Sequence, residues 1–380
     1  MKYKNINIKS FRGIKEFELN NASKVNVILG QNNSGKSSIL EAIFLLTGYN
    51  NPQLVLTVDV FRNLLHNELN DFRFIFYNLD YNSRITLEAD LYPNNENRKL
   101  EIIPKAGKKG KSVQKIDLNS DTGITPSAGR QIAQNSMPSI DDNLVNTLEF
   151  KSEVKTPHSS RQHNSATITV NKTLPNSLDF INDPGEKKIV SFKAIYHGAS
   201  VKFQDDIVQR LESLLIEKRK TALVNDLKII EKNIIDIITT KNSMIYVDIG
   251  AERMLPANLM GDGFFKYLNI ITKMHEVKGG VILIDEIENG LHFSSLKNLW
   301  RIILHYCNDF DIQVFVTTHS KEALIYLKEV LEEIEMKAFQ EEVKCYTISK
   351  LNDGILKAYP YDFSSFEYAI ENDVEIRGEI

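Results

Sequence analysis

The sequence predicts an α/β fold whose central sheet is built from both ends of the chain. Three observations indicate this class. The apolar run Val25–Leu29 is followed at once by a glycine-containing loop, and then by a helical pattern over Ser38–Leu46. Two further short, wholly apolar runs, Val281–Ile284 and Val314–Val316, lie in the last third of the chain. Such runs are typical of parallel strands that are buried on both faces.

The N-terminal region carries strand patterns on both sides of the loop. Residues 3–29 alternate apolar and polar side chains, which predicts two short antiparallel strands before the buried one. Further strands are predicted over Phe72–Phe76 and Ile85–Leu91.

The middle of the chain changes character. Residues 107–186 are rich in Ser, Asn, Thr and Lys with little periodicity, and weak strands are expected there because long structureless loops are uncommon in compact domains. Asp205–Ile238 has no Gly or Pro and predicts two amphipathic helices. We therefore divide the chain into an N-terminal part of the α/β head (1–104), a partly helical insertion (105–240) and a C-terminal part of the head (241–380).

The C-terminal region alternates strand and helix patterns around the two apolar runs. Asn352-Asp353-Gly354 is a strong hairpin turn. The expected elements are a strand over Met244–Ile249, helices over Phe264–His275 and Leu296–Cys307, and hairpin strands over Cys345–Ile348 and Ile355–Tyr359.

Composition limits the class of protein. The 380 residues carry a net charge of -4, so nucleic acid would be contacted only through a local patch such as Pro104–Lys111, although short lysine runs are usually just solvated. Cys307 and Cys345 are too few for a disulfide framework or a zinc site and indicate a reducing compartment. The sequence lacks a membrane-length apolar run and a signal peptide, so we expect a cytoplasmic protein without membrane contact.

The loop after Val25–Leu29 matches the phosphate-binding P-loop pattern completely. Its glycines allow backbone N–H groups to surround phosphates, and the helix that follows presents its positive end to the same anion. Lys36 would reach the β- and γ-phosphates of ATP, and the Ser37 hydroxyl would bind Mg²⁺. The predicted nucleotide-binding residues of the loop are Gly30, Asn32, Asn33, Ser34, Gly35, Lys36, Ser37 and Ser38.

Two acids follow the apolar run Val281–Ile284. Acids at the carboxyl end of a buried strand lie where α/β sheets bind ligands. Asp285 is predicted to be the second-sphere magnesium partner, and Glu286 is placed to orient or deprotonate the attacking water. A strand that simply meets solvent at an acidic turn gives the same dipeptide, but the complete P-loop favours the catalytic interpretation.

Several motifs together resemble a known family. Phe11-Arg12-Gly13, Gly30–Ser38, Asp285–His292 and Val316–Ser320 resemble the ABC-type ATPase heads of SMC-like repair proteins and of the overcoming-lysogenization-defect (OLD) family. The resemblance covers roughly 1–50 and 240–325. With Met260-Gly261-Asp262-Gly263 added, the pattern is most similar to the standalone AAA-15/AAA-21 ATPases of bacterial anti-phage systems.

The resemblance implies further site residues. His319 would be the switch histidine that contacts the γ-phosphate, and Glu288–His292 would be the loop that crosses a dimer interface. Gly261 and Gly263 would belong to the signature that binds the opposite subunit's nucleotide, although the usual Ser-Gly-Gly core is absent. Arg12 would lie near the nucleotide. The alternatives are a solvent-facing histidine, a helix entry capped by an acid, and an ordinary surface arginine.

The resemblance also implies a role. ATP would be held between two heads of a homodimer. Only 60 residues follow Ser320, and they lack the acids of a TOPRIM metal site, so we expect no nuclease in this chain. We therefore expect an ATPase that senses infection or DNA state and controls a separately encoded effector, as in anti-phage defence. A DNA-repair or chromosome-associated clamp is the alternative, and the long insertion argues against a transporter subunit.

Overall fold

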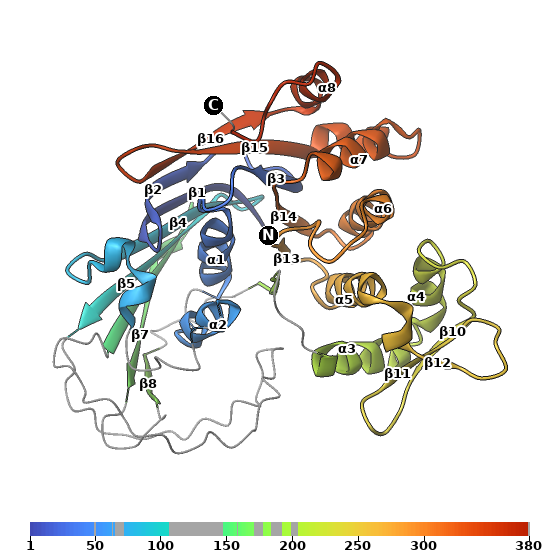
Figure 1. Ribbon diagram of the computed structural model, residues 1–380. Coiled ribbons are helices and arrows are strands. Elements are labelled where there is room, and N and C mark those ends of the chain that lie inside the picture. The colour runs from blue at the N-terminus through green and yellow to red at the C-terminus, as the bar shows by residue number, and fades with distance from the viewer. Residues whose placement is uncertain are drawn as a thin grey trace. The chain divides into compact units, whose positions relative to one another are not determined.

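Both compact units of the computed structural model are assembled from segments that are distant in the sequence (Figure 1). The first unit comprises Met1–Ala22, Asn32–Phe192 and Ile348–Ala358. The second comprises Ser23–Gln31, Lys193–Thr347 and Tyr359–Ile380. The structure describes residues 1–48, 51–62, 64, 72–105, 147–157, 159–170, 178–183, 192–198 and 204–378. Much of the basic run at 104–111 and of the predicted insertion therefore lies outside the described residues.

An antiparallel sheet forms the first unit. Its strand order is β8-β7-β6-β5-β4-β1-β2, and β16 runs parallel beside β2. Alternate residues of β4 are buried, as period-two patterns require. The strands are β1 (Lys2–Phe11), β2 (Ile14–Leu19), β4 (Ile85–Tyr92), β5 (Glu96–Lys105), β6 (Thr147–Thr156), β7 (Ser159–Val170), β8 (Leu178–Asp183) and β16 (Ile355–Tyr361).

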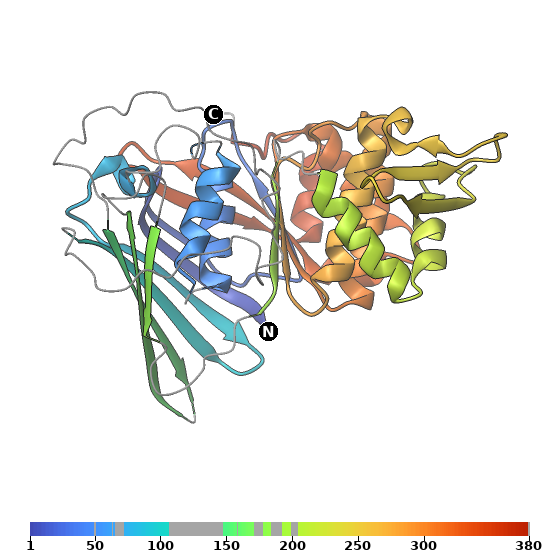
Figure 2. The same cartoon turned by 90° about the horizontal axis from the view of Figure 1, so that it is seen from below.

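Helix α1 (Lys36–Thr47) packs against β1 and β4 of this sheet (Figure 2). Helix α2 (Gln53–Phe61) packs on α1. The strand predicted over Phe72–Phe76 is wrong, because Phe72–Ile75 forms a turn of 3₁₀ helix (η1) and a second one, η2, spans Tyr77–Leu79. The physical reason is the spacing of the apolar side chains: positions 72, 75 and 76 are buried, which is a helical rather than an alternating pattern.

A second group of strands forms the core of the second unit. Their order is β15-β3-β14-β13-β9, and each neighbouring pair is parallel. All residues of β3, β13 and β14 are buried, which confirms the buried parallel strands predicted from the apolar runs. The strands are β3 (Val25–Leu29), β9 (Ala194–His197), β13 (Val281–Ile284), β14 (Gln313–Thr318) and β15 (Val343–Lys350).

Six helices and a small three-stranded sheet complete the described part of the second unit. The indole of Trp300 is fully buried and donates to the Ala323 carbonyl at 2.8 Å, which ties α6 to α7. The helices are α3 (Gln204–Ile216), α4 (Lys220–Leu227), α5 (Asp262–Glu276), α6 (Phe293–Asp309), α7 (Lys321–Glu332) and α8 (Phe363–Glu371). The small sheet is β10 (Asp236–Thr239), β11 (Ile245–Asp248) and β12 (Leu255–Pro256), and 3₁₀ helices η3 (Ala257–Met260) and η4 (Lys337–Glu342) follow.

The strand register brings three chain segments to one edge of the second unit. Leu29 of β3 pairs with Thr318 of β14, and Val316 of β14 pairs with Ile284 of β13. The three strands are parallel, so the residues that follow them emerge at the same edge. Gly30, His319 and Asp285 are those residues.

The described elements confirm most of the predicted ones. The α/β class is confirmed, because β3 from the N-terminal region lies between β14 and β15 from the C-terminal region. Strands β6, β7 and β8 confirm that weak strands lie within residues 107–186. Within the described residues, no helix is both long enough and apolar enough to cross a membrane.

Candidate nucleotide-binding and hydrolysis site

The predicted P-loop leaves β3 as a turn with left-handed positions and enters α1. Asn33 and Gly35 have φ values of 64° and 93°. A Cβ atom on Gly35 would lie 2.8 Å from Leu356 Cδ1, so a side chain there meets both backbone strain and a close neighbour. The Ile39 amide donates to the Gly35 carbonyl at 3.0 Å, which closes the first turn of the helix. This is the backbone form that a phosphate-binding loop requires.

Two polar side chains of the loop are buried, whereas Asn32 and Asn33 are exposed. Ser34 and Lys36 are 8% and 7% exposed. The Ser34 hydroxyl is buried and, among the described residues, has no hydrogen-bond partner. An unpaired buried hydroxyl costs free energy, and a phosphate oxygen would satisfy it. Ser37 is half-buried and follows in the first turn of α1. The residues present therefore fit a nucleotide phosphate.

Arg12 lies in an ion-pair network with α1 and α2. Its guanidinium is 2.5 Å from Glu41 Oε2 and 2.9 Å from Asp59 Oδ1. Glu41 is fully buried and also pairs with Arg62 at 2.5 Å. Arg62 in turn donates to the Ser38 hydroxyl at 3.4 Å, beside the P-loop. These contacts brace α1, and the nucleotide-binding role of Arg12 stays a prediction.

Asp285 is held by two hydroxyl groups. Thr317 Oγ1 donates to one carboxylate oxygen at 2.6 Å, and the Tyr196 hydroxyl donates to the other at 3.0 Å. The side chain is 8% exposed. These two bonds fix the orientation of the carboxylate, and carboxylate oxygens are ligands that Mg²⁺ prefers. The donor set fits a magnesium site.

Glu286 has a left-handed backbone. Its φ is 50°, which is uncommon for a residue with a side chain. Its amide donates to the Thr317 hydroxyl at 2.8 Å. Thr317 therefore holds both residues of the acid pair, one through the carboxylate and the other through the backbone. Strained backbone of this kind is often found at catalytic sites.

His319 follows β14 and is bound by a carboxylate. Glu288 Oε1 lies 2.9 Å from both the amide nitrogen and the imidazole Nδ1 of His319. Glu288 Oε2 accepts from the Thr318 hydroxyl at 2.8 Å. The imidazole stays 45% exposed, so it is oriented and still accessible. The arrangement suits a side chain that contacts substrate.

The predicted signature glycines lie at the start of α5. Gly261 has a φ of 86° and precedes the helix, and a Cβ there would meet nothing within 4 Å. A Cβ on Gly263 would lie 3.6 Å from Leu291 Cδ2, an ordinary contact. An open helix N-terminus flanked by glycines can approach an anion closely. This geometry is compatible with the predicted role.

Sequence reasoning missed two residues of this site. Tyr196 lies on β9, a four-residue strand without a recognisable pattern. Thr317 lies inside the histidine motif, and its position before His319 is a signal that could have found it. Its two hydrogen bonds depend on the register of β13 against β14.

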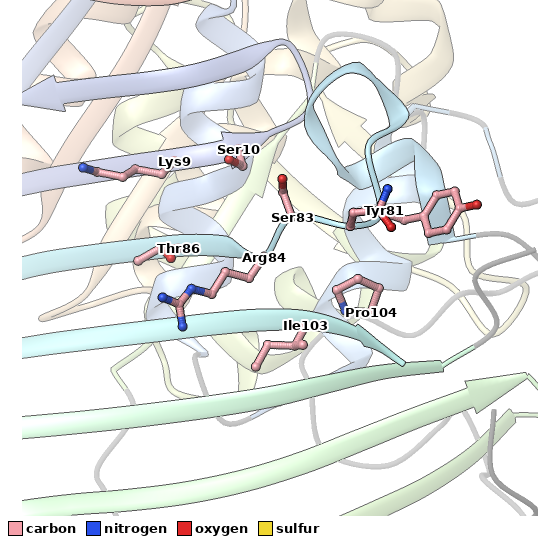
Figure 3. Close-up of a pocket in the computed structure, with 9 residues that line it drawn as sticks. Lys9, Ser10, Tyr81, Ser83, Arg84, Thr86, Ile103 and Pro104 are labelled. Atoms are coloured by element: carbon pink, nitrogen blue, oxygen red, sulfur yellow. The ribbon is translucent and has the colours of Figure 1, made fainter. Parts of the chain in front are cut away.

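Two other features of the surface have structural explanations. The pocket in Figure 3 lies in the first unit and is lined by Lys9, Arg84 and neighbouring residues, none of them a predicted site residue. Lys9 and Arg84 are paired with Glu16 at 2.7 Å and Glu101 at 3.4 Å, so neither is a ready anion ligand.

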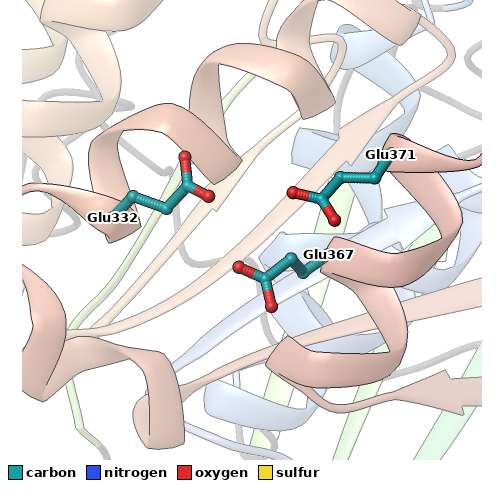
Figure 4. Close-up of side chains that lie close together, drawn as sticks. All are labelled: Glu332, Glu367 and Glu371. Carbon is teal, nitrogen blue, oxygen red and sulfur yellow. The ribbon is translucent and has the colours of Figure 1, made fainter.

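An acidic cluster lies between α7 and α8. Glu332, Glu367 and Glu371 bring their carboxylates together (Figure 4). The ammonium of Lys328 lies 2.7 Å from Glu332 and 3.0 Å from Glu371. An internal cation therefore already pairs with two of the three carboxylates, and the cluster does not require a metal ion.

Comparison with known proteins defines the class. Residues 25–325 match the family described as "AAA domain, putative AbiEii toxin, Type IV TA system". This match spans most of the chain and includes the P-loop, the acid pair and His319. The chain belongs to this family of AAA-domain proteins, and it is an ATPase.

Two individual relatives match the chain over very different lengths. The chain is 26% identical over 382 residues to an ATP/GTP phosphatase of Helicobacter pylori, covering 98% of this chain and 99% of the relative. A 41-residue stretch is 56% identical to the DNA replication and repair protein RecF of Shewanella sp. strain MR-4, covering 11% of each.

Solved structures of SMC heads are also similar. An SMC head bound to the C-terminal winged-helix domain of ScpA aligns with a TM-score of 0.47 and 12% identity, covering 98% of this chain and 100% of that one. The SMC head domain from Thermotoga maritima gives 0.42 and 10%, covering 95% and 99%.

Proposed function

We propose that the chain is a nucleotide-dependent switch that senses infection and controls a separately encoded effector in anti-phage defence. The observation that carries the proposal is that Asp285 and Glu286, held by Thr317, and His319, held by Glu288, follow strands that end at the same edge as β3. Among the described residues, the one further cluster of metal-type ligands is the acidic group already paired with Lys328.

The roles follow from chemistry. Lys36 places a cation on the β- and γ-phosphates of ATP, and the Ser34 hydroxyl and the N–H groups of the loop bind their oxygens. Ser37 would bind Mg²⁺, with Asp285 as its second-sphere partner, and the ion would neutralise phosphate charge. Tyr196 and Thr317 hold the Asp285 carboxylate in place.

Hydrolysis needs an activated water and a stabilised phosphate. Glu286 accepts the proton of the attacking water. His319, oriented by Glu288, donates a hydrogen bond to the γ-phosphate. Gly261 and Gly263 serve the nucleotide of a second copy of the chain, so the working form is a homodimer. The open space at Gly261 supports this role.

Two observations support a two-protein system. The family's own description names a toxin and a toxin–antitoxin system. An ATPase whose described residues hold no second catalytic centre can act by changing its affinity for a partner with nucleotide state. The relative named ATP/GTP phosphatase supports hydrolysis and makes GTP the second substrate to assay.

The role is tested in cells that carry the gene with its neighbours. We expect an adjacent nuclease or other toxic gene, co-purification of the two proteins, and phage resistance that is lost in Lys36→Ala and Glu286→Gln variants. Phage plating that is identical with wild-type and variant proteins contradicts the defence role.

The alternative function is a DNA-repair or chromosome clamp, and the stretch shared with RecF favours it. A clamp predicts salt-dependent DNA binding by the ATPase alone and sensitivity of deletion strains to DNA damage. Tight, ATP-dependent DNA binding combined with normal phage plating decides for the clamp.

A further inference from the structure

Lys266 on α5 reaches a segment that follows β13. Its ammonium donates to the carbonyl oxygens of Glu286 at 3.3 Å and Ile287 at 2.6 Å, and also to that of Asn289. An ammonium has three donor protons, and here three backbone acceptors converge on it. The contact joins the helix that begins with the signature glycines to the backbone of the catalytic acid.

The position of the Lys266 ammonium is unfavourable for its charge. Lys266 is partly buried, and burial lowers its pKa to about 8, although the carboxylates of Glu288 and Glu286 oppose this shift. Partly burying an ammonium is unfavourable unless hydrogen bonds replace its water. A surface lysine without a structural contact would extend its ammonium into solvent instead.

The segment that Lys266 holds carries two functional side chains. Glu286 has the left-handed backbone described above, and Glu288 binds His319. The turn is closed internally by bonds from the Asn289 amide to the Glu286 carbonyl at 2.9 Å and from the Leu291 amide to the Glu288 carbonyl at 3.1 Å. A shift of α5 would move these carbonyls, and with them the two acids.

The neighbouring cations of α5 and α3 make other contacts. Lys273 donates to the Tyr196 carbonyl at 3.0 Å, and Arg210 donates to Asn269 at 2.9 Å. They attach α5 to β9 and α3. Lys266, in contrast, attaches α5 to the 286–289 segment.

We propose that Lys266 is a positioning residue that couples the signature helix to Glu286 and Glu288, so that engagement of a second subunit at Gly261 and Gly263 sets the hydrolytic geometry. This inference rests on the proposed function of the site and adds its regulation. Lys266 itself does not touch substrate.

The test compares Lys266→Met, Lys266→Gln and Lys266→Arg with the control Lys278→Met, which removes an ammonium lying 5.2 Å from the Phe310 ring centroid. Two quantities are measured on full-length protein: kcat and KM for ATP, and hydrogen exchange of the 286–291 amides. We expect Met and Gln to lower kcat about tenfold or more at nearly constant KM, because positioning rather than binding is lost.

We also expect faster exchange in the 286–291 segment, partial recovery of kcat in the Arg variant, which keeps the charge, and no change in the control. Unchanged exchange in both neutral variants overturns the inference, as does a kcat within about twofold of wild type. If the wild-type protein hydrolyses no ATP, the proposed function fails, and the exchange measurement alone still decides whether Lys266 holds the segment.

Discussion

Glu288 grips His319 at two points: one carboxylate oxygen lies 2.9 Å from both its backbone nitrogen and its Nδ1. The carboxylate holds the imidazole through Nδ1, which leaves Nε2 to face substrate. The resemblance to ABC-type heads implied that Glu288–His292 crosses a dimer interface. The side chain of Glu288 is engaged within its own chain, whereas Asn289, Gly290 and His292 are exposed.

Replacing Glu288 with Gln tests whether these two contacts orient His319. The amide is neutral, so the charge-assisted bonds to His319 weaken by about 1.5–3 kcal/mol in total, or roughly 10- to 100-fold in kcat. ATP affinity should change little. The control is Glu329→Gln, which removes an exposed carboxylate paired with Lys297. Steady-state kinetics in which both variants equal wild type would show that His319 needs no such orientation.

Tyr196→Phe tests how Asp285 is held. The variant removes the hydroxyl that donates to Asp285 at 3.0 Å and keeps the ring. Loss of one hydrogen bond to a charged group costs about 1.5–3 kcal/mol. We expect the Mg²⁺ concentration for half-maximal ATPase activity to rise about tenfold or more, with the control Tyr246→Phe unchanged. An unaltered Mg²⁺ requirement would leave Tyr196 as a packing residue.

The pH dependence of hydrolysis should reflect Lys266. Its pKa is lowered by burial to about 8, whereas the ordinary value is 10.5. The facing groups are Glu286, Glu288 and His197, whose own pKa lies well below normal because it is buried. Activity that needs the ammonium should fall as pH rises through about 8.

The contribution of Lys266 to folding stability should change with pH in the opposite direction to activity. The unfolded lysine holds its proton more tightly than the folded one, so this group adds stability as pH rises between the two pKa values and loses it as pH falls through the folded one. Rate and denaturant titrations from pH 7 to 10 check both trends. In Lys266→Arg the fall of activity should disappear, since guanidinium stays charged; an identical profile would assign the fall to another group.

Gly263→Arg tests the composite site. A bulky cation at the start of α5 should occupy the position of a partner's phosphate and abolish hydrolysis, whereas Gly263→Ala should be tolerated because its Cβ meets Leu291 at 3.6 Å. Mixing Gly263→Arg with Lys36→Ala protein should restore at most one working site per dimer. Normal turnover by the Arg variant, measured with its folding confirmed, would remove these glycines from the site.

The sequence predicted the parts of the site whose chemistry is local. The P-loop and the acid pair could be found because glycines, a lysine and carboxylates must follow buried strands to serve a nucleotide. The strand over Ile85–Leu91 could also be predicted, because its alternation of apolar and polar residues indicates one buried face.

What the sequence could not supply depends on pairing between distant segments. Tyr196 reaches Asp285 only because β9 lies beside β13 in register. The Lys266 contact needs α5 placed against the turn after β13. Phe72–Phe76 was misassigned because a short apolar run fits a strand or a helical turn equally well.

The central claim is that Glu286 activates water for ATP hydrolysis, and Glu286→Gln tests it most directly. The amide keeps the size of the side chain but cannot take a proton. A single-turnover experiment on the purified variant should show ATP binding within about twofold of wild type, a hydrolysis rate lowered about 100-fold or more, and an accumulated ATP-bound dimer. Near-normal turnover in this variant would contradict the account, because another group would then be the base.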